Sequence, residues 1–288
     1  MGHHFVPQRY LKGFQPPDNL GFIWMFDKLT LKSKCLPIKQ VAQVPGFYED
    51  EIEISLNVDV EIPGNDVIDK ILAGKPIEDD VNDQDRNHLT YYIATMIRRV
   101  PHARALGQKF IPQTLVEVTG RVRQQLVDAE AVGLLTKAEL EAKLAEADAW
   151  ERKSQKEPPA EVRKMIETPW PFKRWLFAIH NMHWRVLRTE GPSYFLTNDN
   201  PAYFFEGFGL GHEECELILP LSTHLLLHCS WQAVKSSTVQ TIPQQLVKEL
   251  NRRIASGADR FVFYHKDADW VLKAALNQPG QLSRIRWS

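Results

Sequence analysis

This sequence has few cysteines, almost no net charge and no long apolar run, and each shortage excludes a class of protein. Its three cysteines, Cys35, Cys215 and Cys229, form no CxxC pair, so the sequence predicts neither a disulfide framework nor a zinc ribbon. A reducing, cytoplasmic compartment is the expectation. The formal net charge of −1 gives no overall field that would draw the chain to nucleic acid or an anionic membrane. No apolar run approaches the ~18 residues of a membrane span, so we expect no membrane partner.

Several familiar catalytic signatures are also missing. The chain has no phosphate-binding glycine loop, no GxSxG nucleophile elbow and no HExxH zinc motif. Cys35 and Cys229 lie in apolar runs typical of strands, where thiols are usually inert. The sequence therefore gives no support for a nucleotide-binding P-loop, a serine hydrolase, a zinc protease or a cysteine nucleophile.

The pattern of the 288 residues predicts an α+β fold. Predicted elements are mixed at the start, helical in the middle and mostly strands at the end, without βαβ alternation. We expect the N-terminal and C-terminal regions to meet in one mixed or antiparallel sheet. The expected organisation is a single domain, residues 1–288, with a helical insertion or lobe at about 62–188.

Individual stretches support this organisation. Residues 22–26 are continuously apolar and residues 29–35 alternate, which predicts a hairpin. Residues 89–100 carry an apolar stripe at helical spacing, which Pro101 should end or kink. Two prolines and several charges make residues 153–159 the expected linker.

The N-terminal segment holds the most informative pattern. Residues 3–14 read HHFVPQRYLKGF, with two adjacent histidines ahead of Pro7 and an aromatic turn. Neighbouring imidazoles can bind a metal or move protons near neutral pH. The folded-protein character of Tyr10 and Phe14 argues against the alternative that the histidines are the remnant of a tag.

This start resembles the domain of unknown function 4238 family, whose members begin His-His-x-x-Pro-x-x-Tyr-Leu-x-x-Phe. The residues Arg98-Arg99-Val100-Pro101 resemble its Arg-x-Pro helix end, and Thr197-Asn198-Asp199-Asn200-Pro201 resembles its Thr-Ser-Asp-Asn-Pro block. Leu250-Asn251 also fits the pattern. The likeness spans roughly the whole chain, and it indicates which residues to examine without implying a reaction.

From these blocks we predict a metal site and its surroundings. Imidazole and carboxylate suit a divalent ion that activates water, so His3, His4 and Asp199 are the expected metal ligands and catalytic residues. Asp199 could equally cap its own loop ahead of Pro201. The expected substrate-binding residues are Arg98, Arg99, Asn200 and Asn251, although Asn251 could instead support a turn.

The His-His-x-x-Pro start also resembles the ββα-metal nucleases of the His-Asn-His type. That resemblance would place His3 on the metal and make His4 the general base. The rest of their pattern is missing, because residues 22–44 contain neither His nor Asn.

Two weaker candidates remain. His180 and His183 would share one helix face if the helix continued through both, although packed histidines are the simpler interpretation. Arginine and lysine residues recur on the middle helices and on a later one, where they suit phosphate or ordinary ion pairs; they are Arg98, Arg99, Arg104, Lys109, Arg121, Arg123, Arg252 and Arg253.

The leading hypothesis is a metal-dependent phosphodiester hydrolase of nuclease type, with nucleic acid or a nucleotide as substrate. Such a protein would serve as a toxin or phage-defence effector. The alternatives are a non-catalytic regulatory or binding module and a metal-independent nucleotide-modifying enzyme. A protein partner or a homo-oligomer stays open, as do the substrate and the identity of the metal.

Overall fold

A computed structural model describes residues 2–74, 83–204, 209–233 and 239–276 of the chain. The chain divides into two compact units, one formed by Met1–Val100 with Pro169–Ser288 and the other by Pro101–Thr168. The fold is α+β, as the sequence predicts. None of the helices in the described ranges is long and apolar enough to cross a membrane.

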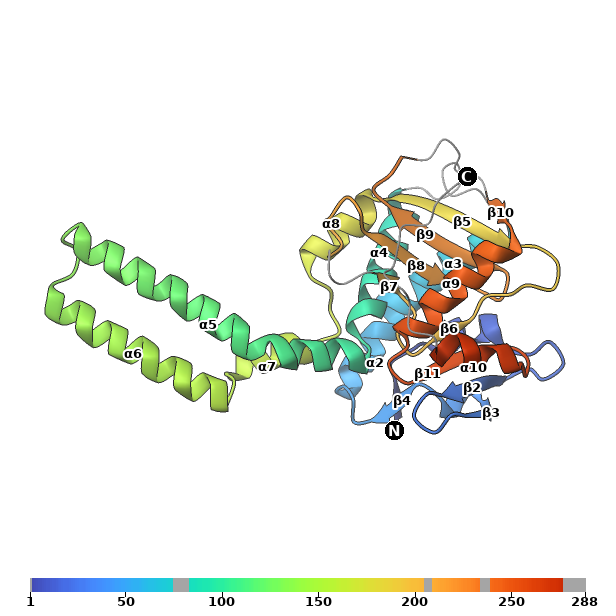
Figure 1. Ribbon diagram of the computed structural model, residues 1–288, viewed down its shortest axis with the longest axis horizontal. Coiled ribbons are helices and arrows are strands. Elements are labelled where there is room, and N and C mark those ends of the chain that lie inside the picture. The colour runs from blue at the N-terminus through green and yellow to red at the C-terminus, as the bar shows by residue number, and fades with distance from the viewer. Residues whose placement is uncertain (1, 75–82, 205–208, 234–238, 277–288) are drawn as a thin grey trace. The chain divides into compact units, whose positions relative to one another are not determined.

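The first unit contains three sheets (Figure 1). Strands from both ends of the chain meet in the four-stranded sheet, in the order β3-β2-β11-β6 with antiparallel neighbours. The five-stranded sheet has the order β10-β5-β9-β8-β7, and only the β10–β5 pair is parallel. The third sheet pairs β1 with β4. The strands are β1 (Gly2–His4), β2 (Phe22–Asp27), β3 (Lys32–Pro37), β4 (Gln43–Pro45), β5 (His183–Thr189), β6 (Thr197–Asn198), β7 (Tyr203–Phe204), β8 (Glu216–Pro220), β9 (Leu225–Ser230), β10 (Gln240–Ile242) and β11 (Phe261–Tyr264).

The helices of the first unit cover these sheets. They are α1 (Gln8–Leu11), η1 (Lys12–Phe14), η2 (Ile38–Gln40), α2 (Asp50–Ser55), the π-helical η3 (Leu56–Glu61), α3 (Ile62–Leu72), α4 (Asp83–Arg98), α8 (Lys173–Asn181), α9 (Gln244–Gly257) and α10 (Asp269–Leu276). The α9 residues Val247, Leu250 and Ile254 recur at helical spacing and are buried. They share one core with Phe26 of the four-stranded sheet and Leu226 of the five-stranded sheet, so α9 joins the two sheets.

The second unit is a helical hairpin with a short third helix. It consists of α5 (Pro101–Ala131), α6 (Lys137–Lys156) and α7 (Ala160–Glu167). Thr136 begins α6 with a capping box, in which its hydroxyl accepts from the Glu139 N–H and Glu139 accepts from the Thr136 N–H. The guanidinium of Arg123 on α5 bonds Asp148 and Glu151 on α6 at 2.7 Å each.

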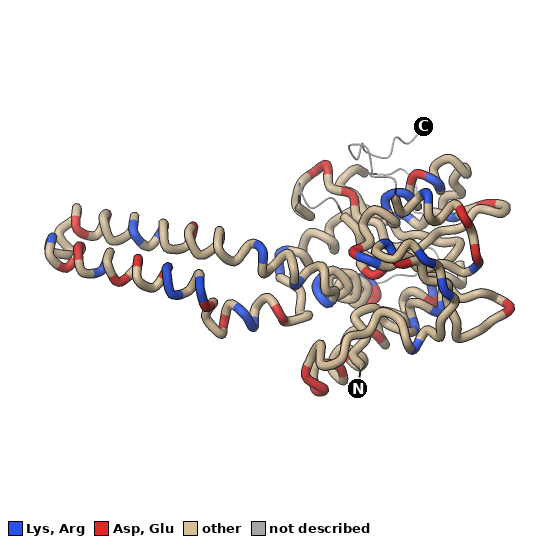
Figure 2. Tube along the Cα trace, turned by 60° about the horizontal axis from the view of Figure 1, so that its bottom comes forward, with Lys and Arg blue, Asp and Glu red and all other residues tan. Residues whose placement is uncertain are grey.

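Acidic and basic residues are interspersed along α5 and α6 (Figure 2), and Arg123 makes ion pairs across the hairpin. Two expectations are wrong. Residues 153–159 are not one linker, because α6 continues to Lys156. His180 and His183 do not share a helix face, because α8 ends at Asn181 and His183 begins β5.

Candidate functional site

His3 is a structural residue of the N-terminal strand. Its Nδ1 accepts a hydrogen bond from the backbone N–H of Tyr48 at 2.9 Å, and its Nε2 lies 3.0 Å from the Asp50 carboxylate. A neutral imidazole has one donor and one acceptor nitrogen, so Nδ1 is the acceptor and Nε2 donates to Asp50. The ring also stacks on Tyr48. Both nitrogens of His3 are therefore engaged, and neither is open to a metal ion.

His4 is the next residue in β1, and its ring faces a different environment. The ring makes a hydrogen bond to the backbone of Lys39, while Nε2 is buried without a hydrogen-bond partner among the described residues. Burial lowers the pKa of His4 below its ordinary value, and the positive charge of Arg99 lowers it further. The Lys39 bond thus orients a neutral imidazole whose Nε2 lone pair is free to accept a proton.

Glu53 on α2 lies against the same strand. Its carboxyl group accepts a hydrogen bond from the backbone N–H of His4, and its Oε2 is buried without a partner in the described part of the chain. Burial raises the pKa of Glu53 above its ordinary value, although the nearby Arg99 opposes that shift. A carboxyl group in this setting holds a proton more tightly than one in water.

Arg99 holds these segments together. Its Nη1 donates to the Glu61 carboxylate at 2.6 Å, its Nη2 donates to the His4 carbonyl, and its own carbonyl accepts from the Tyr48 hydroxyl. The side chain is 1% exposed. Arg99 follows α4, and Glu61 closes the π-helical η3, a type of turn that is frequent at functional sites.

We call His4, Glu53, Glu61 and Arg99 the His4 cluster. It contains a potential base, a potential acid and a buried ion pair within one polar interior. Within the cluster, His4 Nε2, Glu53 Oε2 and Arg99 Nε have no hydrogen-bond partner among the described residues, and a buried polar atom in that state costs ~1–3 kcal/mol.

Asp199 lies elsewhere and braces the start of β11. Its two carboxylate oxygens accept three backbone N–H groups, from Asp259 at 2.8 Å, Arg260 at 2.7 Å and Phe261 at 2.8 Å. Burial raises the pKa of Asp199 to about 6, against the lowering effect of these three bonds. Asp199 therefore does not cap its own loop, because its carboxylate binds the backbone of a distant segment and Asn198 makes the Asx turn ahead of Pro201.

The structure does not gather His3, His4 and Asp199 into a metal centre. In the described ranges, no group of three or more His, Cys, Asp or Glu residues is placed to hold a metal ion. The reason is that His3 is bonded to Tyr48 and Asp50, while Asp199 is bonded to the backbone ahead of β11. Periodicity could not show these partners, because they come from segments distant in the sequence.

The expected substrate-binding residues also serve the fold. The guanidinium of Arg98 lies 4.6 Å from the centre of the Phe172 ring. Asn200 donates its backbone N–H to Asn198 Oδ1 at 2.8 Å, an Asx turn. Asn251 accepts from the Leu196 N–H at 2.9 Å and donates to the Tyr194 carbonyl at 2.7 Å.

Sequence reasoning missed Glu53 and Glu61. Both belong to an acidic stretch, residues 49–61, whose composition is typical of a solvent-exposed segment. A helical register that places Glu53 and Glu61 on the face toward β1 is the only sequence signal that could have identified them.

Comparison with known proteins gives one match. No curated protein and no solved structure matches the chain. A family model described as protein of unknown function (DUF4238) matches residues 2–268. That match covers nearly the whole chain, including the histidine pair, Arg99 and the Asp199 block, and the chain belongs to this family.

Proposed function

We propose that the chain cleaves RNA phosphodiester bonds by general acid–base catalysis at the His4 cluster. Nε2 of His4 takes the proton from the ribose 2′-hydroxyl as its oxygen attacks phosphorus. The Glu53 carboxyl group gives its proton to the departing 5′-oxygen. The P–O5′ bond breaks, and the products are a 2′,3′-cyclic phosphate and a 5′-hydroxyl.

The observation that carries this proposal is the opposite direction of two pKa shifts in one cluster. Burial lowers the pKa of His4 and raises the pKa of Glu53. The shifts favour a neutral imidazole and a protonated carboxyl group, which are the forms a base and an acid need before the reaction. Burial that disfavours the charged form of both groups brings their pKa values closer together, and perturbed pKa values of this kind cluster at functional sites.

RNA is the phosphodiester whose cleavage needs the fewest catalytic groups from the protein. Its nucleophile, the 2′-hydroxyl, is part of the substrate, so a base and an acid suffice for transesterification. Arg99 is a positioning residue, because it is buried and bonded to Glu61 and His4.

Access to the cluster involves α2. The reactive atoms of His4 and Glu53 are buried, whereas α2, which carries Glu53, has no fully buried side chain. A short helix without buried anchors opens at low cost. We propose that displacement of α2 admits the substrate.

The experiment compares an RNA oligonucleotide with the DNA oligonucleotide of the same sequence, in EDTA and in Mg²⁺ or Mn²⁺. We expect cleavage of RNA alone, unaffected by EDTA, with a cyclic phosphate terminus. His4→Gln and Glu53→Gln should each reduce the rate by ~100-fold or more. The matched controls are His183→Gln and Glu51→Gln, at exposed positions with Glu51 on the same helix as Glu53.

Other outcomes would favour the other hypotheses. Cleavage of DNA that needs added metal would restore the metal-dependent hydrolase. Absence of cleavage in folded protein would favour the binding module. A role as a toxin or phage-defence effector predicts that expression of the wild type, and not of His4→Gln, arrests growth.

A further inference from the structure

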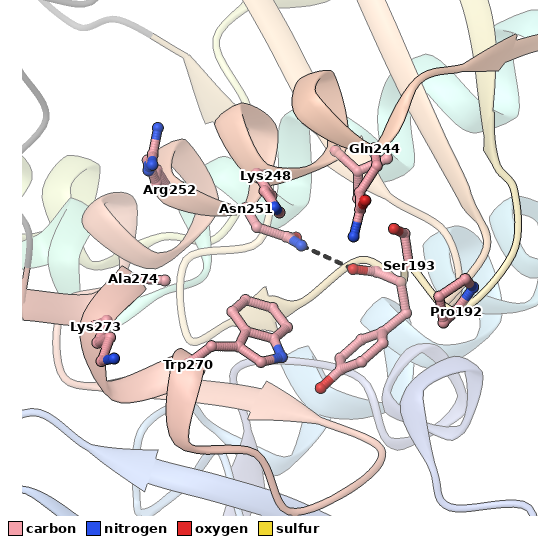
Figure 3. Close-up of a pocket in the computed structure, with 11 residues that line it drawn as sticks. Pro192, Ser193, Gln244, Lys248, Asn251, Arg252, Trp270, Lys273 and Ala274 are labelled. Carbon is pink, nitrogen blue, oxygen red and sulfur yellow. Dashed lines mark hydrogen bonds between the residues drawn. The ribbon is translucent and has the colours of Figure 1, made fainter.

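A second candidate site is a pocket lined by α9, α10 and residues 192–194. The pocket has a volume of about 480 Å³, within the ~300–1,000 Å³ range of small-molecule sites. Figure 3 shows Gln244, Lys248 and Asn251 along α9, with Trp270 facing them from α10. None of these residues belongs to the His4 cluster.

The charge of the lining is entirely positive. Lys248 and Arg252 are one helical turn apart on α9, and Lys273 comes from α10. No acidic residue is among the described residues that line the pocket. Arg252 also pairs with Glu249 on the same helix, with 3.7 Å between its Nη1 and the carboxylate, and both side chains are exposed. Three cations around one pocket favour a ligand that carries more than one negative charge.

The wall of the pocket is aromatic and apolar. Trp270 lines it while 37% exposed, so part of a large planar ring is open to a ligand. Its ring centre lies 5.3 Å from that of Tyr194. Val247 and Ala274 complete the apolar part of the lining. An exposed indole beside cations suits a flat ring joined to an anionic group.

The pocket is held by the core and needs no rearrangement to form. Asn251 fixes the Tyr194 segment through its bonds to the Tyr194 carbonyl and the Leu196 N–H. Val271 and Ala275 bury the other face of α10 in the core that contains α9. A preformed site loses less entropy when a ligand binds.

We propose that this pocket binds a nucleoside phosphate, with the base stacked on Trp270 and the phosphates held by Lys248, Arg252 and Lys273. Gln244 and Ser193 supply the neutral polar groups of the lining. The proposal does not depend on RNA cleavage at the His4 cluster, because the pocket uses other residues and its test measures ligand binding.

The test is calorimetric titration of the full-length chain with ADP, adenosine and pyrophosphate, followed by GDP, CDP and UDP. We expect one ADP per chain, with adenosine and pyrophosphate each at least ten-fold weaker. Pyrophosphate binding as tight as that of ADP would show a simple anion site and overturn the proposal. Absence of saturable ADP binding would overturn it as well.

Variants locate the site. Lys248→Ala and Lys273→Ala should each weaken ADP about ten-fold, which corresponds to ~1.4 kcal/mol. Trp270→Leu should weaken ADP and adenosine and leave pyrophosphate unchanged. Lys34→Ala, on the exposed β3, is the charge-matched control. Unchanged ADP binding in the three pocket variants would refute the assignment, and Glu53→Gln should leave ADP binding intact.

Discussion

The hydroxyl of Tyr10 donates a hydrogen bond to the carbonyl oxygen of Pro220 at 2.7 Å, across 210 residues of sequence. The same hydroxyl lies 2.8 Å from Thr197 Oγ1, which is then the donor of that second bond. Thr197 begins β6 and Pro220 ends β8. Tyr10 therefore links strands of the two larger sheets.

Replacement of Tyr10 by phenylalanine should destabilise the protein by ~1–3 kcal/mol, because a buried carbonyl and a buried hydroxyl lose their partner. Urea unfolding followed by circular dichroism measures the change. Tyr91→Phe is the control, since no hydrogen bond of its hydroxyl is recorded in the described part of the chain. Equal midpoints for Tyr10→Phe and wild type would contradict the link.

Asp199→Asn should cost ~2–3 kcal/mol, because the amide presents an NH₂ group to backbone N–H donors that the carboxylate accepts. The loss should appear in urea unfolding at pH 8, with Asp18→Asn in an exposed turn as control. If Asp199→Asn instead kept full stability and abolished RNA cleavage, Asp199 would be catalytic and the bracing role would be incorrect.

Most of the fold that the sequence predicted consists of individual helices and strands. Apolar patterning identified β2, β3 and α4. The expectation that strands from both ends share a sheet is confirmed by the pairing of β2 with β11. The single helices and strands depend on neighbours a few residues apart, which a pattern records directly, whereas the pairing of β2 with β11 joins segments distant in the sequence.

The site was harder to predict, because its contacts join segments far apart. His4 was identified as a potential base, but its acidic neighbour Glu53 and the Arg99–Glu61 pair depend on how β1, α2 and η3 pack. A one-residue shift in a strand turns a side chain to the other face. That geometry explains why His3 and His4, adjacent in sequence, meet different partners.

Two glycines provide a paired test of helix packing. A Cβ at Gly64 in α3 would lie 2.6 Å from the Cβ of buried Tyr92, so Gly64→Ala should destabilise by ~1–3 kcal/mol. A Cβ at Gly120 in α5 meets nothing within 4 Å, so Gly120→Ala should stabilise its helix by up to ~1 kcal/mol. Thermal unfolding of both variants gives the signs, and stabilisation by Gly64→Ala would show that α3 and α4 are less closely packed.

Acid should destabilise the protein through His265. Burial, with the charges of Lys266 and His224, lowers the pKa of His265 to about 4 from an ordinary value of 6.5. The unfolded chain therefore binds a proton that the folded chain excludes, and stability falls as the pH drops from about 6.5 to about 4. His265→Gln should reduce this slope in urea titrations at several pH values, whereas an unchanged slope would assign the effect to other groups.

The division of the first unit into two stretches of sequence has a consequence for biosynthesis. Arg260 at the start of β11 pairs with Asp27 at the end of β2, and the two are 233 residues apart. A ribosome adds ~5–20 residues per second. More than ten seconds therefore pass between the synthesis of β2 and the synthesis of its neighbour β11. During that interval β2 has an unpaired edge and an uncovered apolar face, which favour aggregation of the nascent chain.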